Sequence, residues 1–374
     1  MANVIANRST NASKLERWLG KEQVEHISGS MRGWYGRKPI LINGVPGAGG
    51  VWCGRGGDFV GKIDGGDFMS LAERCVERVD RAIGKVAGRH AMHGFSSLSD
   101  LINEVTNFGK RKDFTFQKQG SASVAGGTNT MWRVGTYPPA GTAAAAAPGG
   151  TALTDATQGA FFFVNPSSPD TQHFVRADVL SSTAPRTLLL YDRLFEVNKT
   201  MASTATEAVT GAPTRYQNTA DDQPDSADGN FLMVEGQAVL GATAHNWTVC
   251  TYTDHNGNAA TLPSLTGNAS NIINRLDHPV GQWFAPLATG DNGIRTLTQM
   301  QCSASVTGTV AFVIGHPIAF MPCVVTNMLT IVDGINTAFN LTRIHDDACL
   351  AFLDVNASST TAATFTGMFA TASG

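Results

Sequence analysis

The first third of the chain carries hydrophobic positions at helical spacing. In residues 12–29 the apolar side chains fall roughly on one side, and Gly29 ends the pattern. In residues 67–86 apolar side chains recur every fourth residue with charges between them, which is typical of an amphipathic helix. Residues 96–108 repeat this pattern, with a serine as the N-cap and Gly109 after the last turn. The pattern therefore predicts three short helices before residue 110.

Residues 31–68, between the first two of these helices, are rich in glycine and contain only isolated large apolar residues. Glycine at this density cannot build a hydrophobic core of its own, so the segment is predicted to be an extended arm. Each of its large aromatic side chains gains about 2 kcal/mol or more when it is buried. We expect them to anchor the arm on a neighbouring subunit, and the candidate assembly residues are Trp34, Trp52, Phe59 and Phe68.

From residue 114 onward the helical spacing disappears, and beyond residue 158 the pattern is that of β-strands. Short alternating or wholly apolar runs are separated by turns rich in glycine, proline and asparagine. The pattern predicts a mainly β protein, with a β-sandwich or jelly roll over residues 114–374. A helical segment, residues 67–113, and an N-terminal helix with the Gly-rich arm, residues 1–66, precede it. An internal boundary near residue 200 is an alternative within the β domain.

Two β-hairpins are predicted inside this domain. Residues 247–261 alternate around Asn256-Gly257, which is the preferred sequence of a two-residue hairpin turn. Residues 299–314 alternate up to Thr307-Gly308, and the chain then returns as a strand that is apolar on both faces from Val310 to Ile314. We expect this second pair to be a hairpin whose return strand lies in the middle of a sandwich.

The composition favours a protein whose surface is largely covered by other copies. Of the 374 residues 42% are hydrophobic and only 15% are charged, and the formal net charge is −3. A weakly charged surface opposes association less than a strongly charged one. The balance also gives no overall attraction to nucleic acid, and the basic run at 110–113 is more typical of a solvated helix end. We expect no specific nucleic-acid binding.

The sequence contains no segment that predicts contact with a membrane. The N-terminal residues lack an apolar leader, and no window reaches the ~18 uncharged apolar residues of a membrane span. We therefore expect synthesis in a reducing cytoplasm. The cysteines are scattered without metal-ligand spacing, so free buried thiols are expected at Cys53, Cys75, Cys250, Cys302, Cys323 and Cys349.

Three motifs resemble ligand sites, and two of them fail on their details. Gly56–Lys62 fits the phosphate-binding G-x-x-x-x-G-K pattern, but Ile63 replaces the required hydroxyl and the following residues cannot begin a helix. Asp254–Asn258 resembles the start of a calcium loop, but its glycine comes two places early and Leu265 would stand at position twelve. The acidic loop at 221–230 is more typical of a solvated loop, with a weak calcium site as the alternative.

No catalytic arrangement can be assembled from the remaining residues. Asp192 and Glu196 lie four apart on one face of a predicted strand and could act as a glycosidase pair, but Arg193 and the flanking leucines favour a surface ion pair or a turn. His316 and His345 have no visible acidic partner, and core or capping roles are more common for such histidines. We predict no catalytic, cofactor-binding or metal-binding residues, no cofactor, and no enzymatic activity.

The order of several segments resembles virion structural proteins of tailed bacteriophages. The resemblance spans about residues 114–355 and is carried by "AFFFVNPS", "TLLLYDRLFEV", "WTVCTYTDHNGNAATLPSL", "FAPLATGDNGIRTLTQMQCSASVTGTVAFVIGHPIAF" and "DDACLAFLDV". It implies a self-assembling structural protein in or on the capsid, as a shell, decoration or vertex component. The implied partners are other copies and other virion proteins, and the implied location is the virion, after synthesis in the host cytoplasm. Residues before 110 lie outside the resemblance.

Alternatives to this interpretation remain for both fold and function. The rival fold is the α+β core of the widespread phage shell proteins, which would require one long helix in the second half of the chain. The second function is a tail-associated carbohydrate- or receptor-binding jelly roll, in which Trp247, Trp283 and Tyr252 could stack on sugars. Core packing is the more usual role of such aromatic residues. A glycan hydrolase is the third function.

Overall fold

The computed structural model describes residues 94–95, 97–107, 109–219, 225–334 and 341–374, together with the backbone of two short N-terminal strands. The chain divides into two compact units, Met1–Met92 and His93–Gly374. In the first unit the strands β1 (Gly50–Cys53) and β2 (Phe59–Ile63) pair antiparallel. The second unit contains the rest of the described structure, in which no helix is long and apolar enough to cross a membrane.

The second unit begins with the helix α5 (Leu98–Asn107) and is otherwise built from strands. The Ser97 Oγ accepts a hydrogen bond from the Asp100 backbone N–H at 3.1 Å, which caps the helix as its sequence predicts. Gly109 follows the helix with φ of +62°, a conformation in which glycine avoids the penalty of a side chain. The predicted helix at 96–108 is therefore confirmed.

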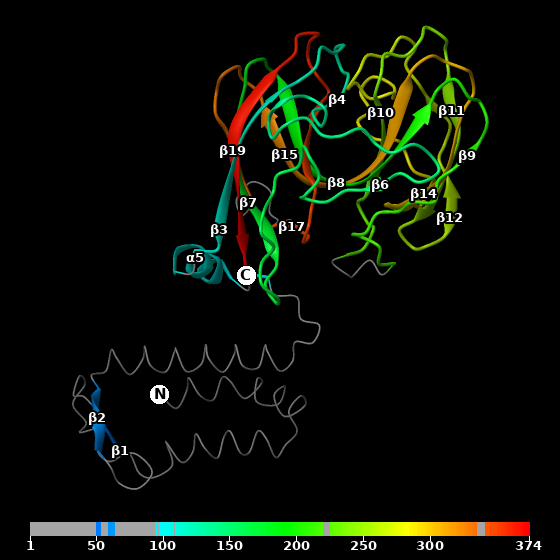
Figure 1. Cartoon of the computed structure of the whole chain (residues 1–374). Helices are drawn as coiled ribbons and strands as arrows, with labels where there is room; N and C mark the ends of the chain where they lie inside the picture. Colours follow the sequence, from blue (N-terminus) through cyan, green and yellow to red (C-terminus); the bar gives the residue numbers. More distant parts are fainter. Residues whose placement is uncertain are drawn as a thin grey trace. The chain divides into compact units, whose positions relative to one another are not determined.

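A six-stranded antiparallel sheet forms the centre of this unit (Figure 1). Its two longest strands, β8 (Arg186–Thr200) and β15 (Thr309–Cys323), each contain 15 residues and pair along their whole length. Figure 1 shows these two strands running through the middle of the unit, between its two lobes. The other members are β10 (Phe231–Gly236), β18 (Leu350–Val355), β4 (Asn129–Thr130) and β6 (Thr151–Ala152).

Two further antiparallel sheets lie in the two lobes (Figure 1). One contains β12 (Ala259–Thr261), β11 (Asn246–Asp254), β14 (Ile294–Cys302), β9 (Glu207–Ala208) and β13 (Leu265–Thr266). The other contains β16 (Thr330–Asp333), β7 (Gln172–Ser181), β19 (Thr364–Ser373), β3 (Arg111–Gln119), β5 (Thr136–Tyr137) and β17 (Arg343–Ile344). The expectation of a mainly β fold is confirmed.

Both outer sheets pack on side chains of the same long strands. Leu188 and Leu190 of β8 belong to the hydrophobic core that includes β7 and β19, whereas Val197 belongs to the core that includes β11 and β14. Residues between them, such as Leu189 and Tyr191, belong to a third core that also includes Trp132 and Leu153. A single pair of strands therefore supplies side chains to three cores, and the result is two sandwiches that share a central sheet.

The hairpin predicted across Thr307-Gly308 is wrong. Strand β14 pairs with β11 and β9, whereas β15 pairs with β10 and β8, so the two strands belong to different sheets. The physical reason is that β15 is apolar on both faces, and an inner position in the central sheet covers both of them. The inner position predicted for this strand is confirmed. The hairpin at Asn256-Gly257 is also confirmed, because Thr253 pairs with Ala259 and Gly257 has a φ of +88°.

The cysteines of the second unit are free and buried, as expected for Cys250, Cys302, Cys323 and Cys349. Burial raises the pKa of the Cys250 thiol to about 12, so this group remains protonated and unreactive. The side chains of Cys53 and Cys75 lie outside the described residues.

Candidate functional site

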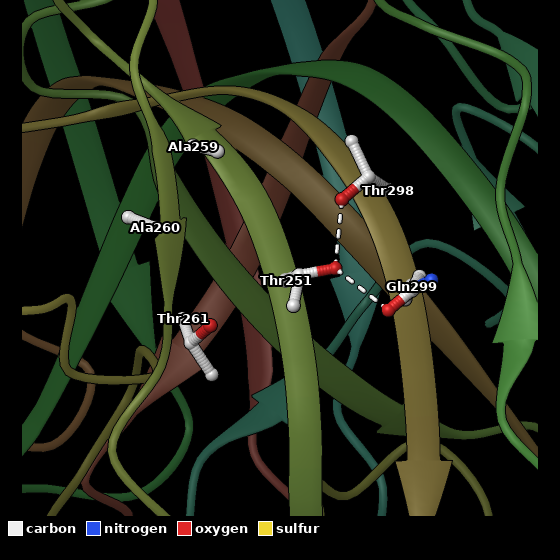
Figure 2. Close-up of a pocket in the computed structure, with 6 residues that line it drawn as sticks. All are labelled: Thr251, Ala259, Ala260, Thr261, Thr298 and Gln299. Carbon is white, nitrogen blue, oxygen red and sulfur yellow. Dashed lines mark hydrogen bonds between the residues drawn. The ribbon is translucent and has the colours of Figure 1, made fainter.

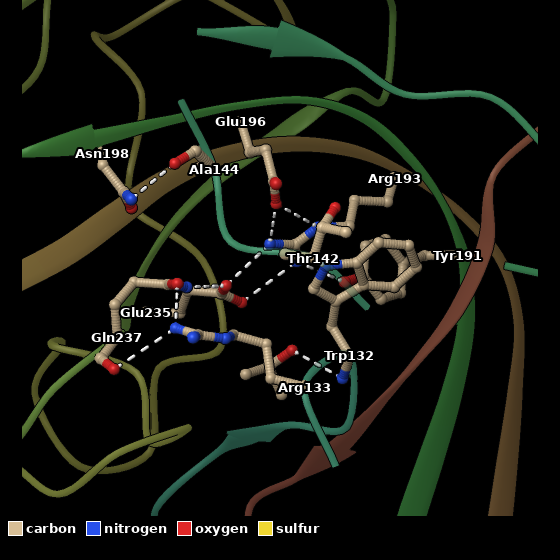
Figure 3. A network of polar contacts seen from close by, with 11 residues as sticks. Trp132, Arg133, Thr142, Ala144, Tyr191, Arg193, Glu196, Asn198, Glu235 and Gln237 are labelled. Atoms are coloured by element: carbon tan, nitrogen blue, oxygen red, sulfur yellow. Dashed lines mark hydrogen bonds and ion pairs between the residues drawn. The ribbon is translucent and has the colours of Figure 1, made fainter. Parts of the chain in front are cut away.

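A fully buried ion-pair network lies at the middle of β8 (Figure 3). The Arg193 guanidinium donates hydrogen bonds to both carboxylate oxygens of Glu235, at 3.0 and 2.7 Å, and its Nε donates to Glu196 at 2.9 Å. Its Nη1 also donates to the Tyr191 hydroxyl at 3.1 Å, and the guanidinium lies 5.1 Å from the centre of the Trp132 ring. One arginine thus supplies the counter-charge for two carboxylates that would be costly to bury alone, and it bonds both oxygens of Glu235 but only Oε2 of Glu196.

The network continues from Glu235 through Gln237 to Arg133 (Figure 3). Gln237 donates its amide to Glu235, and Arg133 donates to the Gln237 amide oxygen. Burial raises the pKa of Glu196 above its usual value, although the nearby Arg193 charge opposes this shift. Arg193, Glu196 and Glu235 are buried and bond to one another, so we interpret the network as structural.

The predicted pairing of Asp192 with Glu196 on one face of a strand is wrong. The register between β8 and β15 shifts at Ile314 and Gly315, so Leu194 is an extra residue in β8. This bulge turns Glu196 to the side of Arg193, whereas Asp192 accepts two bonds from Arg215, at 2.9 and 2.7 Å. The expected ion pair between Arg193 and Glu196 exists, but it is buried and not on the surface.

The two histidines without a visible partner lie together against one tyrosine. The Tyr216 ring stacks on His316 with centroids 4.2 Å apart and meets His345 edge-on at 4.3 Å. The His316 Nδ1 lies 2.9 Å from the Asn230 side-chain oxygen, and the His345 Nε2 lies 3.5 Å from the Asp225 carboxylate. Both histidines therefore have packing partners, which agrees with the core or capping role expected of them.

Three side chains lie close enough together to be considered as a metal site. One ligand atom each from Asp254, His255 and Asp291 lies within 4.8 Å of the others, where the turn after β11 meets the loop before β14. The Asp254 carboxylate already accepts the backbone N–H of Asn258 at 2.7 Å, and Asp291 accepts the Tyr252 hydroxyl at 2.5 Å. These bonds account for the positions of both carboxylates as turn-stabilising groups.

Calcium binding by the acidic loop at 221–230 remains an untested alternative, because residues 221–224 lie outside the described residues. Within the described part, Asp225 accepts a hydrogen bond from Arg343 at 3.2 Å. This carboxylate is therefore already partnered by a protein cation.

A shallow groove of about 360 Å³ lies on the sheet formed by β11, β12 and β14 (Figure 2). Its floor is polar, since the Thr251 hydroxyl lies 2.8 Å from the Thr298 hydroxyl and 3.4 Å from the Gln299 side-chain oxygen. The lining residues are small or polar: Thr251, Ala259, Ala260, Thr261, Thr298 and Gln299. The groove therefore lacks the aromatic platform on which sugar rings commonly stack.

The tryptophans considered for sugar stacking lie in apolar surroundings. Trp247 is buried, packs edge-on against Phe312 at 4.8 Å, and donates its indole N–H to Asp277 at 3.0 Å. His278, which follows Asp277 in the chain, is also buried, and its Nε2 accepts a hydrogen bond from the Val234 backbone N–H at 2.8 Å. Trp283 is half-buried among aromatic rings. Trp247 therefore has the core-packing role that was the more usual interpretation.

The most distinctive exposed feature is an apolar surface on the connection between β15 and β16. Between Phe320 and Val332 the sequence contains no charged residue. Six apolar side chains of this segment are between 44% and 69% exposed, namely Phe320, Val324, Val325, Met328, Leu329 and Ile331. We refer to these six residues as the 320–331 surface; it bends around the edge of the sandwich, because Phe320 on β15 and Ile331 on β16 point away from the core between their two sheets. The Trp283 ring lies beside two exposed rings, with its centre 5.5 Å from that of Phe320 and 4.8 Å from that of Phe284. Trp283 and Phe284 thus extend the apolar area next to Phe320.

The predicted assembly residues are only partly described. Trp34 and Phe68 lie outside the described residues, and Trp52 and Phe59 belong to β1 and β2, whose side chains are not described. Their role as anchors therefore remains a prediction. Strand β2 (Phe59–Ile63) also contains Lys62 of the phosphate-loop pattern, and the residues that follow it, where the helix of such a loop would begin, lie outside the described residues.

Sequence reasoning missed both the 320–331 surface and the Arg193 network. The uncharged run in the sequence extends from Thr296 to Val332 and includes the largely buried strand β15, so absence of charge did not single out the exposed part. The network had no local signal either. Glu235 lies 42 residues from Arg193, and only the order of the strands in the central sheet brings them together.

We expect Arg193→Met to lower the free energy of unfolding by about 3–5 kcal/mol, since it leaves two buried carboxylates without their cation. The partly exposed pair of Arg176 and Asp178 provides the control, and Arg176→Met should cost less than about 1 kcal/mol. Urea unfolding measures both. If Arg193→Met does not fold, the triple variant Arg193→Met, Glu196→Leu, Glu235→Leu should recover folding. Equal small effects of the two arginine variants would contradict the interpretation.

Stability should also depend on the neutral form of His278. Burial lowers the pKa of this histidine from 6.5 to about 4, so the folded state favours the uncharged ring. Its contribution is complete above pH 6.5 and is lost as the pH falls towards 4, by up to about 3 kcal/mol. His278→Gln retains an acceptor for the Val234 N–H but does not titrate. Urea unfolding between pH 7 and pH 4 should show a steeper loss for the native protein, and parallel curves would refute the assignment.

Comparisons with known proteins do not show a family. No protein-family model matches the chain, and no curated protein matches it. Among solved structures, infectious bursal disease virus Gt strain aligns over 70% of this chain and 81% of that chain, with 10% identity and a TM-score of 0.14. The VP2 subviral particle of infectious bursal disease virus aligns over 70% and 80%, with 8% identity and a TM-score of 0.15. Superpositions of this quality carry no argument about fold or function.

Proposed function

We propose that this protein is a self-assembling structural component of a phage virion, located in or on the capsid as a shell, decoration or vertex protein. The observation that carries the proposal is where the phage-like segments lie in the fold. "TLLLYDRLFEV" belongs to β8, "DDACLAFLDV" contains β18, and the segment from "FAPLATGDNGIR" to "GHPIAF" contains β14 and most of β15. The resemblance therefore concerns the strands that hold the fold together.

A resemblance that lies in the strands of the fold, and not in its loops, supports a structural role better than a catalytic one. Enzymes of one fold differ mainly in the loops and side chains that carry their chemistry, whereas a structural protein functions through its framework and surface. The described clusters of ionisable residues agree with this role. The Arg193 network, the Asp192–Arg215 pair and the Asp254 turn each form bonds that stabilise the fold.

Self-association is supported by the composition and by the exposed surface. Only 15% of the residues are charged, so copies repel one another weakly. The 320–331 surface offers apolar side chains that gain free energy when another molecule covers them. The proposed partners are other copies of this chain and other virion proteins, and the proposed location is the virion after synthesis in the host cytoplasm.

Purified particles provide the direct test of this function. An antibody against this protein should label gradient-purified phage particles in immunogold electron microscopy, and mass spectrometry of the same particles should detect peptides from residues 93–374. Labelling of the head would support the capsid location, whereas labelling of the tail would refute it. Recovery of the protein only outside the particle fraction of an infected lysate would refute the virion role.

We also propose that residues 31–68 bind a neighbouring copy through Trp34, Trp52, Phe59 and Phe68. Replacing all four by serine in the full-length chain should weaken assembly, because each anchor loses about 2 kcal/mol or more of burial energy. The circular dichroism of the β region should not change. A matched control replaces four polar residues of the same segment by serine, and sedimentation velocity measures assembly in both. Unchanged assembly of the aromatic variant would show that the arm is unattached.

A further inference from the structure

The outer edge of β10 is covered by the connection between β13 and β14. Strand β10 ends the central sheet and has β15 as its only partner among the described strands. Residues 267–285, which we call the strap, bond to its other edge. Three backbone hydrogen bonds join them, from Asp277 N–H to the Val234 carbonyl, from Gly236 N–H to the Arg275 carbonyl and from Ala285 N–H to the Leu232 carbonyl, at 2.7, 2.9 and 2.7 Å. The strap therefore protects an edge that could otherwise pair with another chain.

A buried pair of side chains, His245 and Asp277, fastens the strap beside the start of β11. The His245 Nε2 lies 2.8 Å from an Asp277 carboxylate oxygen, and its Nδ1 lies 3.1 Å from the Thr243 carbonyl oxygen. Asp277 also accepts the Trp247 indole N–H at 3.0 Å and the Asn268 backbone N–H at 2.6 Å, and such donors favour an ionised carboxylate. An imidazole ring can donate to oxygen acceptors at both nitrogens only when it is protonated. The geometry therefore requires a charged His245.

The backbone of the strap lies directly on this pair. The Gly267 N–H donates to the His245 carbonyl at 3.1 Å, and a Cβ at Gly267 would overlap the His245 ring and lie 2.8 Å from the Asp277 carboxylate. Both side chains of the pair are fully buried. Burial lowers the pKa of His245, but the hydrogen bond and the charge of Asp277 outweigh this effect and raise the pKa above its usual value.

His278 fastens the strap to β10 in the opposite protonation state. Its Nε2 accepts the Val234 N–H at 2.8 Å, which a protonated ring could not do because that nitrogen would carry a proton. Burial lowers the pKa of His278 to about 4, against the opposing charge of Asp277. Among the described residues, the other ionisable groups around Asp277 are Arg275 in the strap and the Cys302 thiol of β14.

The other side of the strap is held by backbone bonds alone. The Leu276 N–H donates to the Thr128 carbonyl at 2.9 Å, and the Thr130 N–H donates to the Asn274 carbonyl at 2.7 Å. No ionisable group takes part in these two bonds. A change of pH should therefore act on the β10 side of the strap.

We propose that the strap is a pH-dependent cover of the β10 edge, closed while His245 is charged and His278 is neutral, and loosened when either state is lost. The contribution of His245 is complete below pH 6.5 and is lost as the pH rises through its raised pKa. The contribution of His278 is complete above pH 6.5 and is lost as the pH falls towards 4. The strap should therefore be held most firmly near pH 6.5. This inference does not depend on the virion role.

The first experiment measures amide hydrogen exchange of the full-length protein by mass spectrometry at about pH 4.5, 6.5 and 9. After correction for the intrinsic effect of pH on exchange, protection of residues 232–236 and 267–285 should be highest near pH 6.5. It should fall about tenfold or more at the other two values, because a linked group changes the opening equilibrium by about tenfold per pH unit. Peptides that cover Leu188–Tyr191 of β8 are the control and should keep their protection. Constant protection of the strap, or an equal loss in the control peptides, would overturn the proposal.

Two variants separate the two histidines. His245→Gln can donate a hydrogen bond but carries no charge, so its strap should already be loose at pH 6.5 and should lose little more protection up to pH 9. Its loss of protection in acid should remain. His278→Gln retains an acceptor but does not titrate, so it should remove the loss in acid and leave the loss in alkali. If both losses persist in both variants, other groups control the strap and the proposal is wrong.

Histidine titration in the native protein gives a result even if His245→Gln does not fold. In NMR spectra of protein labelled with ¹³C-histidine, one ring should titrate clearly above pH 6.5 and another below pH 5. The second of these signals should be missing from His278→Gln. Absence of a ring that titrates above pH 6.5 would show that His245 is not held in its charged form, and would overturn the proposal.

Discussion

The pairing of β8 with β15 is the interaction on which the rest of the His93–Gly374 unit depends. These strands pair over 15 residues each, and side chains from them enter all three hydrophobic cores. Each outer sheet therefore packs on part of the same central ladder. A shift of one residue in this ladder would turn the side chains of both sandwiches to the wrong face. The bulge at Leu194 adds a further constraint on the register, because the side chains of β8 change face at this residue and only one alignment of the two strands accommodates that change.

The Arg193 network makes this ladder compatible with buried charge. Strand β15 lies between β8 and β10, yet Arg193 of β8 reaches Glu235 of β10 across it. Small residues leave the necessary space: Glu235 lies opposite Ala311 in the register, and Arg193 lies opposite Gly315. A Cβ at Gly315 would come within 2.9 Å of the Phe231 ring and 2.8 Å of the Tyr191 ring. Glycine at this position therefore permits the aromatic packing beside the network.

Local patterns predicted the elements well, whereas long-range contacts decided their partners. The capping serine and the apolar spacing were sufficient to identify α5, and Asn256-Gly257 was sufficient to identify a hairpin. The alternation before Thr307 identified β14 as a strand but could not show that the next strand belongs to another sheet, because both arrangements satisfy the same local pattern. The same limit applies to Asp192 and Glu196. Their spacing predicted a shared face, and one bulged residue separated them.

Shared strands also determine how the unit bears mechanical load. In a sandwich pair joined only by a linker, a force between the lobes would stretch the linker and leave each lobe intact. Here both long strands belong to both lobes, so the force would act along two chains side by side, and the lobes could separate only if one of them lost its packing on these strands. The Arg193 contact adds a cross-brace over β15 at the middle of this ladder. The two lobes should therefore resist separation as one body when neighbouring molecules pull on them.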